Sequence, residues 1–382
     1  MNNCTLIVDG NWLLMSSLYS SSYDFHPESL DMMKQVSRDT LIDSMCSSIN
    51  VALNTFDGIV DNVIYVSDGG SWRKFIGTPK LMEEGEYKGT RKRAEDIDWD
   101  YVFETHEILQ KGLAEAGITV CHEGKIEGDD WIWHWTRKLN KQGTNCIIWS
   151  TDNDLKQLVN LQNGFYTAWY NSRNGIFFHK DLDPSCIDDI DYFMTAGRDN
   201  YIVESLEQVI KQVSFIDPIN IIKEKIICGD KSDNIRSLIV LNKNGKNYRI
   251  TEKDAADVIS QYNTLDSFFE HKTDIIKQIK GLKKFVNSTE DIDNMDELFD
   301  YNKRLVWLNE SQIPKDLQEK MNTLEYKVIN ITDIKNNYKM LLPSYLQGDA
   351  QKVFESLNEE TDEGDFNWLN TNDLEKMGDL PF

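Results

Sequence analysis

Short apolar runs alternate with longer segments of helical periodicity through the first 200 residues, and this alternation constrains the fold more than any other feature. The apolar runs predict strands at Cys4–Val8, Asn62–Val66, Ile118–Cys121 and Asn145–Trp149. The intervening segments predict helices at Leu41–Phe56, Trp99–Ala116 and Glu127–Leu139. Strands that alternate with helices favour an α/β fold, with a mostly parallel twisted sheet flanked by helices.

The pattern changes near Asp181, where helical spacing replaces the alternation. Just before this point, the turn-rich NSRNG separates Phe165–Tyr170 from Ile176–His179, which predicts a hairpin at one edge of the sheet. Further helices are predicted at Tyr201–Gln212, Ile219–Cys228, Lys253–Gln261 and Thr273–Val286. We therefore expect an α/β domain at residues 1–180 and a helical domain at residues 181–345. Residues 346–382 are acidic and poor in basic residues, which predicts a disordered tail.

Acidic residues gather where the predicted strands end. The acids near strand ends are Asp9, Asp68, Glu127, Asp129, Asp130, Asp152 and Asp154, and the helical region adds Asp230 and Asp233. The carboxyl ends of parallel strands line one crevice, so we expect these side chains to lie close together. Carboxylates packed this closely repel one another unless a cation neutralises them. Oxygen ligands suit Mg²⁺ or Mn²⁺, and two such ions can cleave a phosphodiester without a His or Cys nucleophile.

Simpler interpretations exist for each acid taken alone. An Asp-Gly after a strand, as at Asp9 and Asp68, is often a turn or a helix cap, and Asp152 suits an N-cap. Glu127, Asp129 and Asp130 favour the positive end of a helix dipole whether or not they bind a metal. The recurrence of acids at four strand ends favours a divalent-metal site over these separate explanations.

The formal net charge of −23 argues against a nucleic-acid partner unless the charge is segregated. One basic segment lies between Asp68 and Trp99, with the cations Arg73, Lys74, Lys80, Lys88, Arg91, Lys92 and Arg93. The rings of Trp72, Phe75 and Tyr87 are interleaved with them, which suits single-stranded nucleic acid. A second basic stretch spans Lys243–Lys253. An ordinary solvated loop is the simpler alternative for the first segment.

The cysteines form no closely spaced pair, and several lie inside apolar runs, which favours a reduced chain without disulfides or a zinc site. The N-terminus has no basic-then-apolar leader. No apolar run approaches the roughly 20 residues that cross a bilayer. We expect a soluble, cytoplasmic protein, in a host cell if phage-encoded.

The motifs, in order, resemble the flap endonuclease / 5′-3′ exonuclease family. They are two strand-Asp-Gly units, W-R-K followed by Y-K-x-x-R, E-x-D-D, S-x-D-x-D-L-x-Q-L-V and G-D-x-S-D-N-I, over roughly residues 4–260. Their order and spacing are most similar to the ribonuclease H of T-even-type bacteriophages. The resemblance implies a PIN-like catalytic domain, an arch or bridge at about 70–96 and a helix-three-turn-helix motif at about 222–261 that grips duplex DNA.

The resemblance also implies roles for individual residues. A first metal ion would be held by Asp9, Asp68, Glu127 and Asp129, with Asp130 close behind. A second would be approached by Asp152, Asp154, Asp230 and Asp233, some of them through water. The implied catalytic residues are Lys88, Asp129, Asp130 and Arg91, with Lys88 stabilising the scissile phosphate. The implied nucleic-acid contacts are Arg73, Lys74, Tyr87, Lys88, Arg91, Arg93, Lys243, Lys246 and Arg249.

The sequence departs from the family pattern after Asn234-Ile235. The family has Pro-Gly and a glycine-rich hairpin there, which binds a phosphate through a monovalent ion, whereas this chain continues RSLIVLNKNGK. The ion site is therefore in doubt, and the duplex grip would depend on Lys243, Lys246, Arg249 and Lys253.

The C-terminal tip, Asp379–Phe382, resembles the acidic tip of bacterial single-stranded DNA-binding proteins and, loosely, sliding-clamp-binding peptides. Either likeness would tether the chain to replication machinery, and a merely solubilising end is the alternative.

The function that these features favour is a monomeric, Mg²⁺-dependent 5′-nuclease acting on DNA flaps and RNA·DNA primers, in phage DNA replication. Two alternatives stay open: a PIN-class single-stranded ribonuclease and a non-catalytic replisome adaptor. The sequence leaves undecided whether flaps or exonucleolytic ends, and RNA or DNA, are preferred.

Overall fold

The computed structural model describes residues 3–23, 37–79, 87–89, 91, 93–95, 97–172, 174–186, 213–238, 241–243, 246–279, 289–344 and 346. The chain divides into two compact units. The first comprises residues 1–12, 55–90 and 121–326, and the second comprises residues 13–54, 91–120 and 327–382. The first unit therefore contains most of both predicted regions, 1–180 and 181–345.

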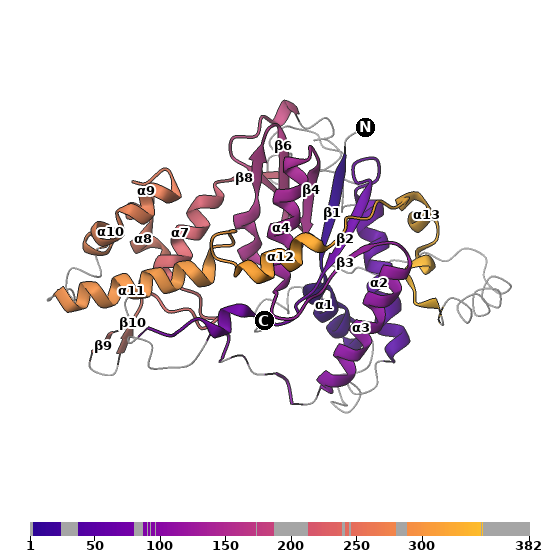
Figure 1. Ribbon diagram of the computed structural model, residues 1–382, viewed down its shortest axis with the longest axis horizontal. Helices are drawn as coiled ribbons and strands as arrows, with labels where there is room; N and C mark the ends of the chain where they lie inside the picture. The colour runs from indigo at the N-terminus through magenta and orange to yellow at the C-terminus, as the bar shows by residue number, and fades with distance from the viewer. Residues whose placement is uncertain are drawn as a thin grey trace. The chain divides into compact units, whose positions relative to one another are not determined.

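A mostly parallel sheet forms the centre of the first unit (Figure 1). Its order is β3-β2-β1-β4-β6-β7-β8, with β5 paired to β6. The strands are β1 (Cys4–Asp9), β2 (Asn62–Val66), β3 (Thr119–Cys121), β4 (Asn145–Trp149), β5 (Asn160–Gln162), β6 (Phe165–Asn171), β7 (Gly175–His179) and β8 (Val213–Ile216). Strand β1 is parallel to β2 and β4, and β4 is parallel to β6. The predicted α/β class is confirmed.

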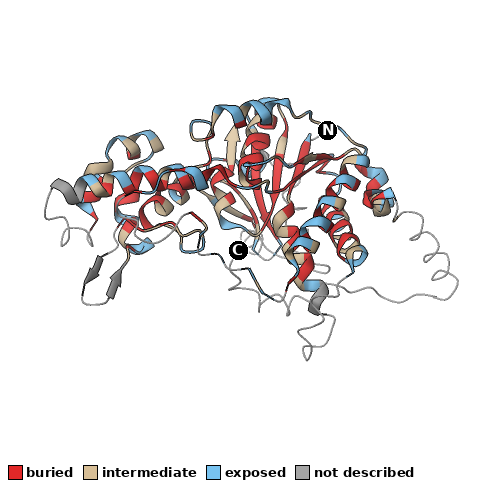
Figure 2. Ribbon diagram, turned by 60° about the horizontal axis from the view of Figure 1, so that its bottom comes forward, coloured by how far each residue is buried: buried red, intermediate tan, exposed pale blue. Residues whose placement is uncertain are grey.

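The central strands are buried on both faces, which explains why they read as continuous apolar runs rather than alternating ones. Figure 2 shows these strands in the colour of buried residues. The hairpin β6–β7 is antiparallel as predicted, but it does not form the edge, because β8 pairs with β7 in parallel. Strand β8 lies where the sequence indicated only helix.

Helix α4 (Gly128–Lys141) packs on the sheet against β1, β2, β4 and β6. Its rings Trp131 and Trp135 are buried, and Tyr326 lies beside Trp135 with a centroid separation of 5.7 Å. The Tyr326 hydroxyl also shares a 2.7 Å hydrogen bond with Thr5 in β1. Burial of these rings fixes the start of α4 relative to the ends of the strands.

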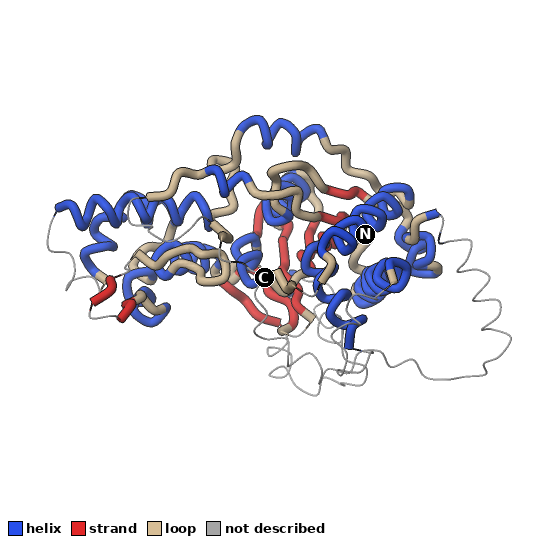
Figure 3. The backbone as a smooth tube through the Cα atoms, turned by 90° about the horizontal axis from the view of Figure 1, so that it is seen from below, coloured by secondary structure: helices blue, strands red, loops and turns tan. Residues whose placement is uncertain are grey.

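The helical part of the first unit packs around α7 (Pro218–Cys228), which contacts α8 (Glu252–Ile259), α9 (Leu265–Glu270) and α11 (Thr289–Val306). Helix α11 runs alongside α7 in Figures 1 and 3. The hairpin β9 (Leu241–Lys243)–β10 (Lys246–Tyr248) lies between α7 and α8 in the chain. Helices α10 (Lys272–Gln278) and α12 (Lys315–Thr323) follow α9 and α11. These helices share one hydrophobic core with α4 and the strands.

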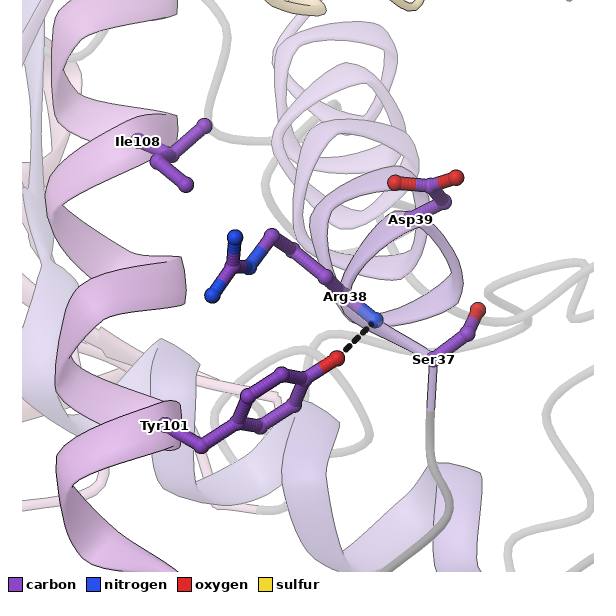
Figure 4. A pocket seen from close by; sticks show the side chains of 5 residues that line it. All are labelled: Ser37, Arg38, Asp39, Tyr101 and Ile108. Atoms are coloured by element: carbon purple, nitrogen blue, oxygen red, sulfur yellow. Dashed lines mark hydrogen bonds between the residues drawn. The ribbon is translucent and has the colours of Figure 1, made fainter.

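The second unit contains α2 (Arg38–Thr55), α3 (Trp99–Glu115) and α13 (Ile331–Asn336). A small opening lies between α2 and α3, lined by Ser37, Arg38, Asp39, Tyr101 and Ile108 (Figure 4). The backbone N–H of Arg38 donates to the Tyr101 hydroxyl there, at 2.8 Å. This contact joins the two helices. No helix among the described residues is long and apolar enough to cross a membrane.

Most predicted elements lie within a few residues of their observed bounds, and several elements were missed. Helix α1 (Gly10–Tyr23), β5, β8, α9, α11, α12 and α13 were not predicted. The helix predicted at Thr273–Val286 ends as α10 at Gln278, and 280–288 lie outside the described residues. The helix predicted at Tyr201–Gln212 and nearly all of the tail predicted at 346–382 also lie outside them.

Two loops next to the sheet are tied together by backbone hydrogen bonds. The N–H of Gly69 donates to Ile126 O at 2.8 Å, and the N–H of Lys125 donates to Gly69 O at 2.9 Å. A Cβ on Gly69 would lie 1.9 Å from the carbonyl oxygen of Glu123. Only glycine allows this approach, which brings the segment after β2 to the segment before α4.

We predict that Gly69→Ala lowers stability by about 1–3 kcal/mol, because the loops must separate to admit the methyl group. Gly124→Ala is the matched control, since its Cβ would meet nothing within 4 Å. Thermal unfolding of the two variants beside the unmodified chain measures the difference. Equal midpoints for both variants would contradict the steric argument.

Candidate active site

Three carboxylates meet at the carboxyl ends of β1, β2 and β4. Asp9 Oδ2 accepts a 2.6 Å hydrogen bond from the Ser150 hydroxyl, which also accepts the Asp152 N–H at 3.0 Å. Asp68 Oδ1 accepts the Gly128 N–H at 2.6 Å. The predicted convergence of strand-end acids is therefore present between the ends of β1 and β4, and between the end of β2 and the start of α4.

Each of these acids also accepts a backbone N–H, from its own turn at Asp9 and Asp152 and from a distant segment at Asp68. Asp9 Oδ1 accepts the N–H of Trp12, Asp152 Oδ1 accepts that of Asp154, and Asp68 accepts at the first residue of α4. The simpler interpretation as caps is thus correct for one oxygen of Asp9 and one of Asp152. Capping orients the carboxyl groups and does not exclude a second role.

A buried ion-pair network lies beneath the start of α4. The Arg73 guanidinium is 2% exposed; its Nη2 lies 2.8 Å from Asp130 Oδ1, and its Nη1 pairs with Glu127. Asp130 also accepts from Trp72 Nε1 at 2.9 Å, and Arg73 Nε donates to Leu305 O at 3.1 Å. The guanidinium contacts both carboxylates and balances one of their two negative charges, and the other faces the Lys88 ammonium beside Glu127.

Lys88 joins the acids to the helical region. Its ammonium lies 2.6 Å from Glu127 Oε1 and 3.9 Å from Asp233 Oδ2. Its backbone N–H donates to Asp233 O at 2.9 Å, and its φ of 57° is in the left-handed region. The neighbouring Tyr87 hydroxyl donates to Asp233 at 3.2 Å and to Glu127 at 3.4 Å. Residues 87–88 are thereby fixed between Glu127 and the turn after α7.

A second lysine lies among the remaining acids. Lys225, in the last turn of α7, pairs with Asp154 and lies 2.6 Å from Asp230 Oδ2. Asp230 Oδ1 accepts from both the backbone and the hydroxyl of Ser232. The acids predicted for a second metal ion thus have partners from the chain itself.

The pKa values divide the acids into two groups. Desolvation raises the pKa of Asp9 to about 7, and it raises the pKa of Asp129 well above its usual range, with Asp152 as the main like charge. Desolvation also raises the pKa of Asp152. Burial opposes ionisation of Glu127, but Lys88 and Arg73 outweigh it and lower that pKa to about 2. Lys225 likewise outweighs desolvation at Asp230, whose pKa falls to about 2.

The donor set suits a divalent cation in its chemistry. All the acids offer hard oxygen ligands, and the ionised forms of Asp9, Asp129 and Asp152 are disfavoured until positive charge joins them. As the side chains stand, no group of three Asp, Glu, His or Cys residues in the described part of the chain is arranged to hold a metal ion. Binding would therefore require side chains to rotate toward the ion.

The chain is similar in sequence to known 5′-3′ exonucleases. Residues 5–181 match the family described as 5′-3′ exonuclease, N-terminal resolvase-like domain. A 5′-3′ exonuclease of Mycoplasmopsis pulmonis is 22% identical over 95% of this chain and 96% of its own length. Over residues 5–181 the chain is therefore similar to the 5′-3′ exonuclease family. The resemblance drawn from the motifs is confirmed at that level.

Two further relatives are more partial or more distant. A 5′-3′ exonuclease of Mycoplasma pneumoniae is 22% identical over 46% of this chain, which spans about half of that relative (48%). A bacteriophage T5 flap endonuclease, solved in a complex with DNA and metal ions, has a TM-score of 0.47 and 16% identity. That comparison covers 94% of this chain and 100% of the T5 chain. The T5 likeness is too distant to carry an argument here.

The predicted nucleic-acid contacts fall in several places. Arg73 and Tyr87 are buried, so the structure does not present them on a surface as the sequence suggested, whereas Lys74 is exposed. Arg91 and Arg93 belong to the second unit, where the Arg93 guanidinium lies 4.9 Å from the Phe103 ring centroid. Three predicted contacts lie in or next to the hairpin after α7: Lys243, Lys246 and Arg249. Arg249 Nε donates to Cys228 O, and the side chains of the other two lie outside the described residues.

Sequence reasoning missed Ser150, Lys225 and the buried role of Arg73. Ser150 stands between β4 and Asp152, and Lys225 precedes Asp230 by one helical turn and a glycine. Their spacing to the acids was visible, but a lysine or serine near an acid is too common to single out.

We predict that Arg73→Met destabilises the protein by about 3–5 kcal/mol, because Asp130 would lose its buried ionic partner and Glu127 would keep only Lys88. Lys74→Met is the control, since this adjacent lysine is exposed. Chemical denaturation of both variants tests this expectation. An Arg73→Met variant as stable as Lys74→Met would show that the network contributes nothing to folding.

The raised pKa of Asp9 predicts that the stability of the protein, kept free of metal by a chelator, changes with pH in an unusual direction. The Asp9 carboxyl binds a proton below about 7 when folded but only below about 3.8 when unfolded, so stability falls as pH rises between these values. Asp9→Asn keeps the acceptor for Trp12 and removes the charge. We expect this variant to exceed the original stability at pH 8 by on the order of 4 kcal/mol, and to match it near pH 4. Thermal unfolding in EDTA at both pH values measures the effect; a pH-independent difference would refute it.

Proposed function

We propose that this chain is a metal-dependent 5′-nuclease that hydrolyses phosphodiester bonds near the 5′ ends of DNA flaps and RNA·DNA primers. The observation that carries the proposal is the convergence of Asp9, Asp68 and Asp152 at strand ends, with Asp129 among their electrostatic neighbours. Removal of RNA primers in phage DNA replication, as in the ribonuclease H of T-even-type phages, is the corresponding biological role.

The residues proposed to hold a first cation are Asp9, Asp68, Glu127 and Asp129, with Asp130 behind them. Those proposed for a second are Asp152, Asp154, Asp230 and Asp233. When bound, two Mg²⁺ or Mn²⁺ ions ~4 Å apart would activate water and neutralise charge on the phosphodiester. The ionic partners of Glu127 and Asp130 favour supporting roles for these two acids, with Asp9, Asp68 and Asp129 nearer to the ion.

Lys88 is the proposed electrostatic stabiliser of the scissile phosphate. Its side chain is only 16% exposed, and its ammonium is already fixed beside Glu127. A cation oriented in advance stabilises developing charge without reorganisation. Arg91 is proposed as a further catalytic cation on the basis of the motif alone.

Duplex DNA is proposed to bind across α7, the β9–β10 hairpin and α8, with Lys243, Lys246, Arg249 and Lys253 as phosphate contacts. Three further proposals rest on the sequence alone. The tail would bind a single-stranded DNA-binding protein or a sliding clamp, the protein would be a monomer, and it would be located in the cytoplasm.

Cleavage of a 5′-labelled flap on nicked duplex tests the proposal, beside an RNA-primed duplex of the same sequence. We expect short 5′ products with Mg²⁺, none with EDTA, and a loss of at least about 100-fold in Asp129→Asn. Asp316→Asn is the matched control, because it is an exposed aspartate in the first turn of α12.

The alternatives give different results in the same assay. Cutting of single-stranded RNA with no cutting of either duplex substrate would favour the PIN-class ribonuclease. No cutting of any substrate at any metal concentration would favour the non-catalytic adaptor.

A further inference from the structure

Lys225 occupies the place where the proposed function puts its second cation. Its ammonium pairs with Asp154 and lies 2.6 Å from Asp230 Oδ2. These two acids come from opposite sides of the site, one after β4 and one after α7. A single positive charge from the chain therefore already bridges the carboxylates that a second divalent ion would bridge.

The backbone builds this contact. Gly229 ends α7 with φ of 65°, and a Cβ there would lie 2.3 Å from the backbone of Arg236. The chain turns sharply, and Asp230 and Ile235 exchange backbone hydrogen bonds of 2.8 and 2.7 Å. This small closed loop returns the Asp230 carboxylate to the last turn of the helix that carries Lys225. The pairing thus follows from the fold of the G-D-x-S-D-N-I segment.

Both oxygens of Asp230 have donors from the chain. Oδ1 accepts from the Ser232 N–H at 2.8 Å and from its hydroxyl at 2.6 Å, and Oδ2 accepts from Lys225. A metal ion that approaches Oδ2 of Asp230 meets the positive charge of the Lys225 ammonium, which repels it unless the lysine withdraws. Ser232 is held by the backbone of the loop, whereas Lys225 is at the end of a flexible chain.

Lys225 also differs from the cations beneath α4. The Arg73 side chain is 2% exposed and anchored to Leu305 O, so it cannot leave its carboxylates without breaking the core. The Lys225 side chain is 18% exposed and can withdraw toward solvent. Only the second of these cations is suited to exchange with an ion from solution.

We propose that Lys225 is the built-in counter-ion of the second cation position and competes with a divalent ion for Asp154 and Asp230. It is a positioning residue: without the second ion it holds the two carboxylates together, and it withdraws when the ion binds. This inference rests on the proposed function, and it predicts that the second ion binds more weakly than the first because an ammonium must be displaced.

Calorimetric titration of the full chain with Mn²⁺ tests the proposal without substrate. Lys225→Met keeps the length of the side chain and removes its charge, so we expect the weaker of two binding steps to tighten on the order of tenfold. Lys231→Met is the matched control, because it removes an equal charge from an exposed lysine in the same loop. In EDTA, Lys225→Met should also unfold at lower temperature than Lys231→Met, and Mn²⁺ should restore it.

The outcomes separate this inference from the proposed function. The competition is overturned, and the proposed function stands, if Lys225→Met binds Mn²⁺ no more tightly than Lys231→Met while the original chain cuts flaps with metal. No Mn²⁺ binding by the original chain overturns both. Lys225→Arg keeps the charge and provides a second test if Lys225→Met does not fold. Tighter second-step binding in Lys225→Arg than in the original chain would also overturn the proposal.

Discussion

The ion pairs of Arg73 with Glu127 and Asp130 are the interaction on which the rest of the site depends. They lie at the first turn of α4, beneath the crevice formed by the strand ends. An unpaired carboxylate at this depth would lose its charge or unfold the helix start, since burial of an isolated ion is costly. Because the Arg73 guanidinium and the Lys88 ammonium together balance the charge of these two acids, the acids above them can remain in excess of their cations.

The same carboxylates accept backbone hydrogen bonds and form the candidate catalytic site. Asp9, Asp68 and Asp152 each use one oxygen to accept a backbone N–H. A capping carboxylate has a fixed orientation, which lowers the entropy that ligand binding would otherwise cost. A strand-end aspartate can therefore be both a cap and a candidate metal ligand, and the two interpretations do not exclude each other.

The sequence predicted what depends on local patterning. The strands β1, β2 and β4 were clear because their runs are apolar along their whole length, and α7 and α8 because their spacing is helical. Strand β8 was missed because only its pairing with β7, across more than 30 residues of chain, makes it a strand.

The environment of the charged residues was equally invisible in the sequence. Arg73 lies in a basic segment that reads as a surface, and its burial is decided by acids 54 and 57 positions away. The segment supplies Arg73 to the core, Lys88 to the largely buried contact with Glu127 and Lys74 to the exterior, which composition cannot distinguish.

The position of β1 has a consequence for how the chain is made. Although β1 precedes the other described strands in the chain, it is central and pairs on one side with β2 and on the other with β4, as in the register of Thr5 with Asn62 and Cys146. A nascent chain that ends before β4 leaves the apolar edge of β1 open, and open edges of this kind pair with other chains. The candidate crevice, which needs the ends of both β1 and β4, thus cannot assemble until both strands have left the ribosome. Until then the N-terminal segment exposes apolar surface that the finished sheet buries.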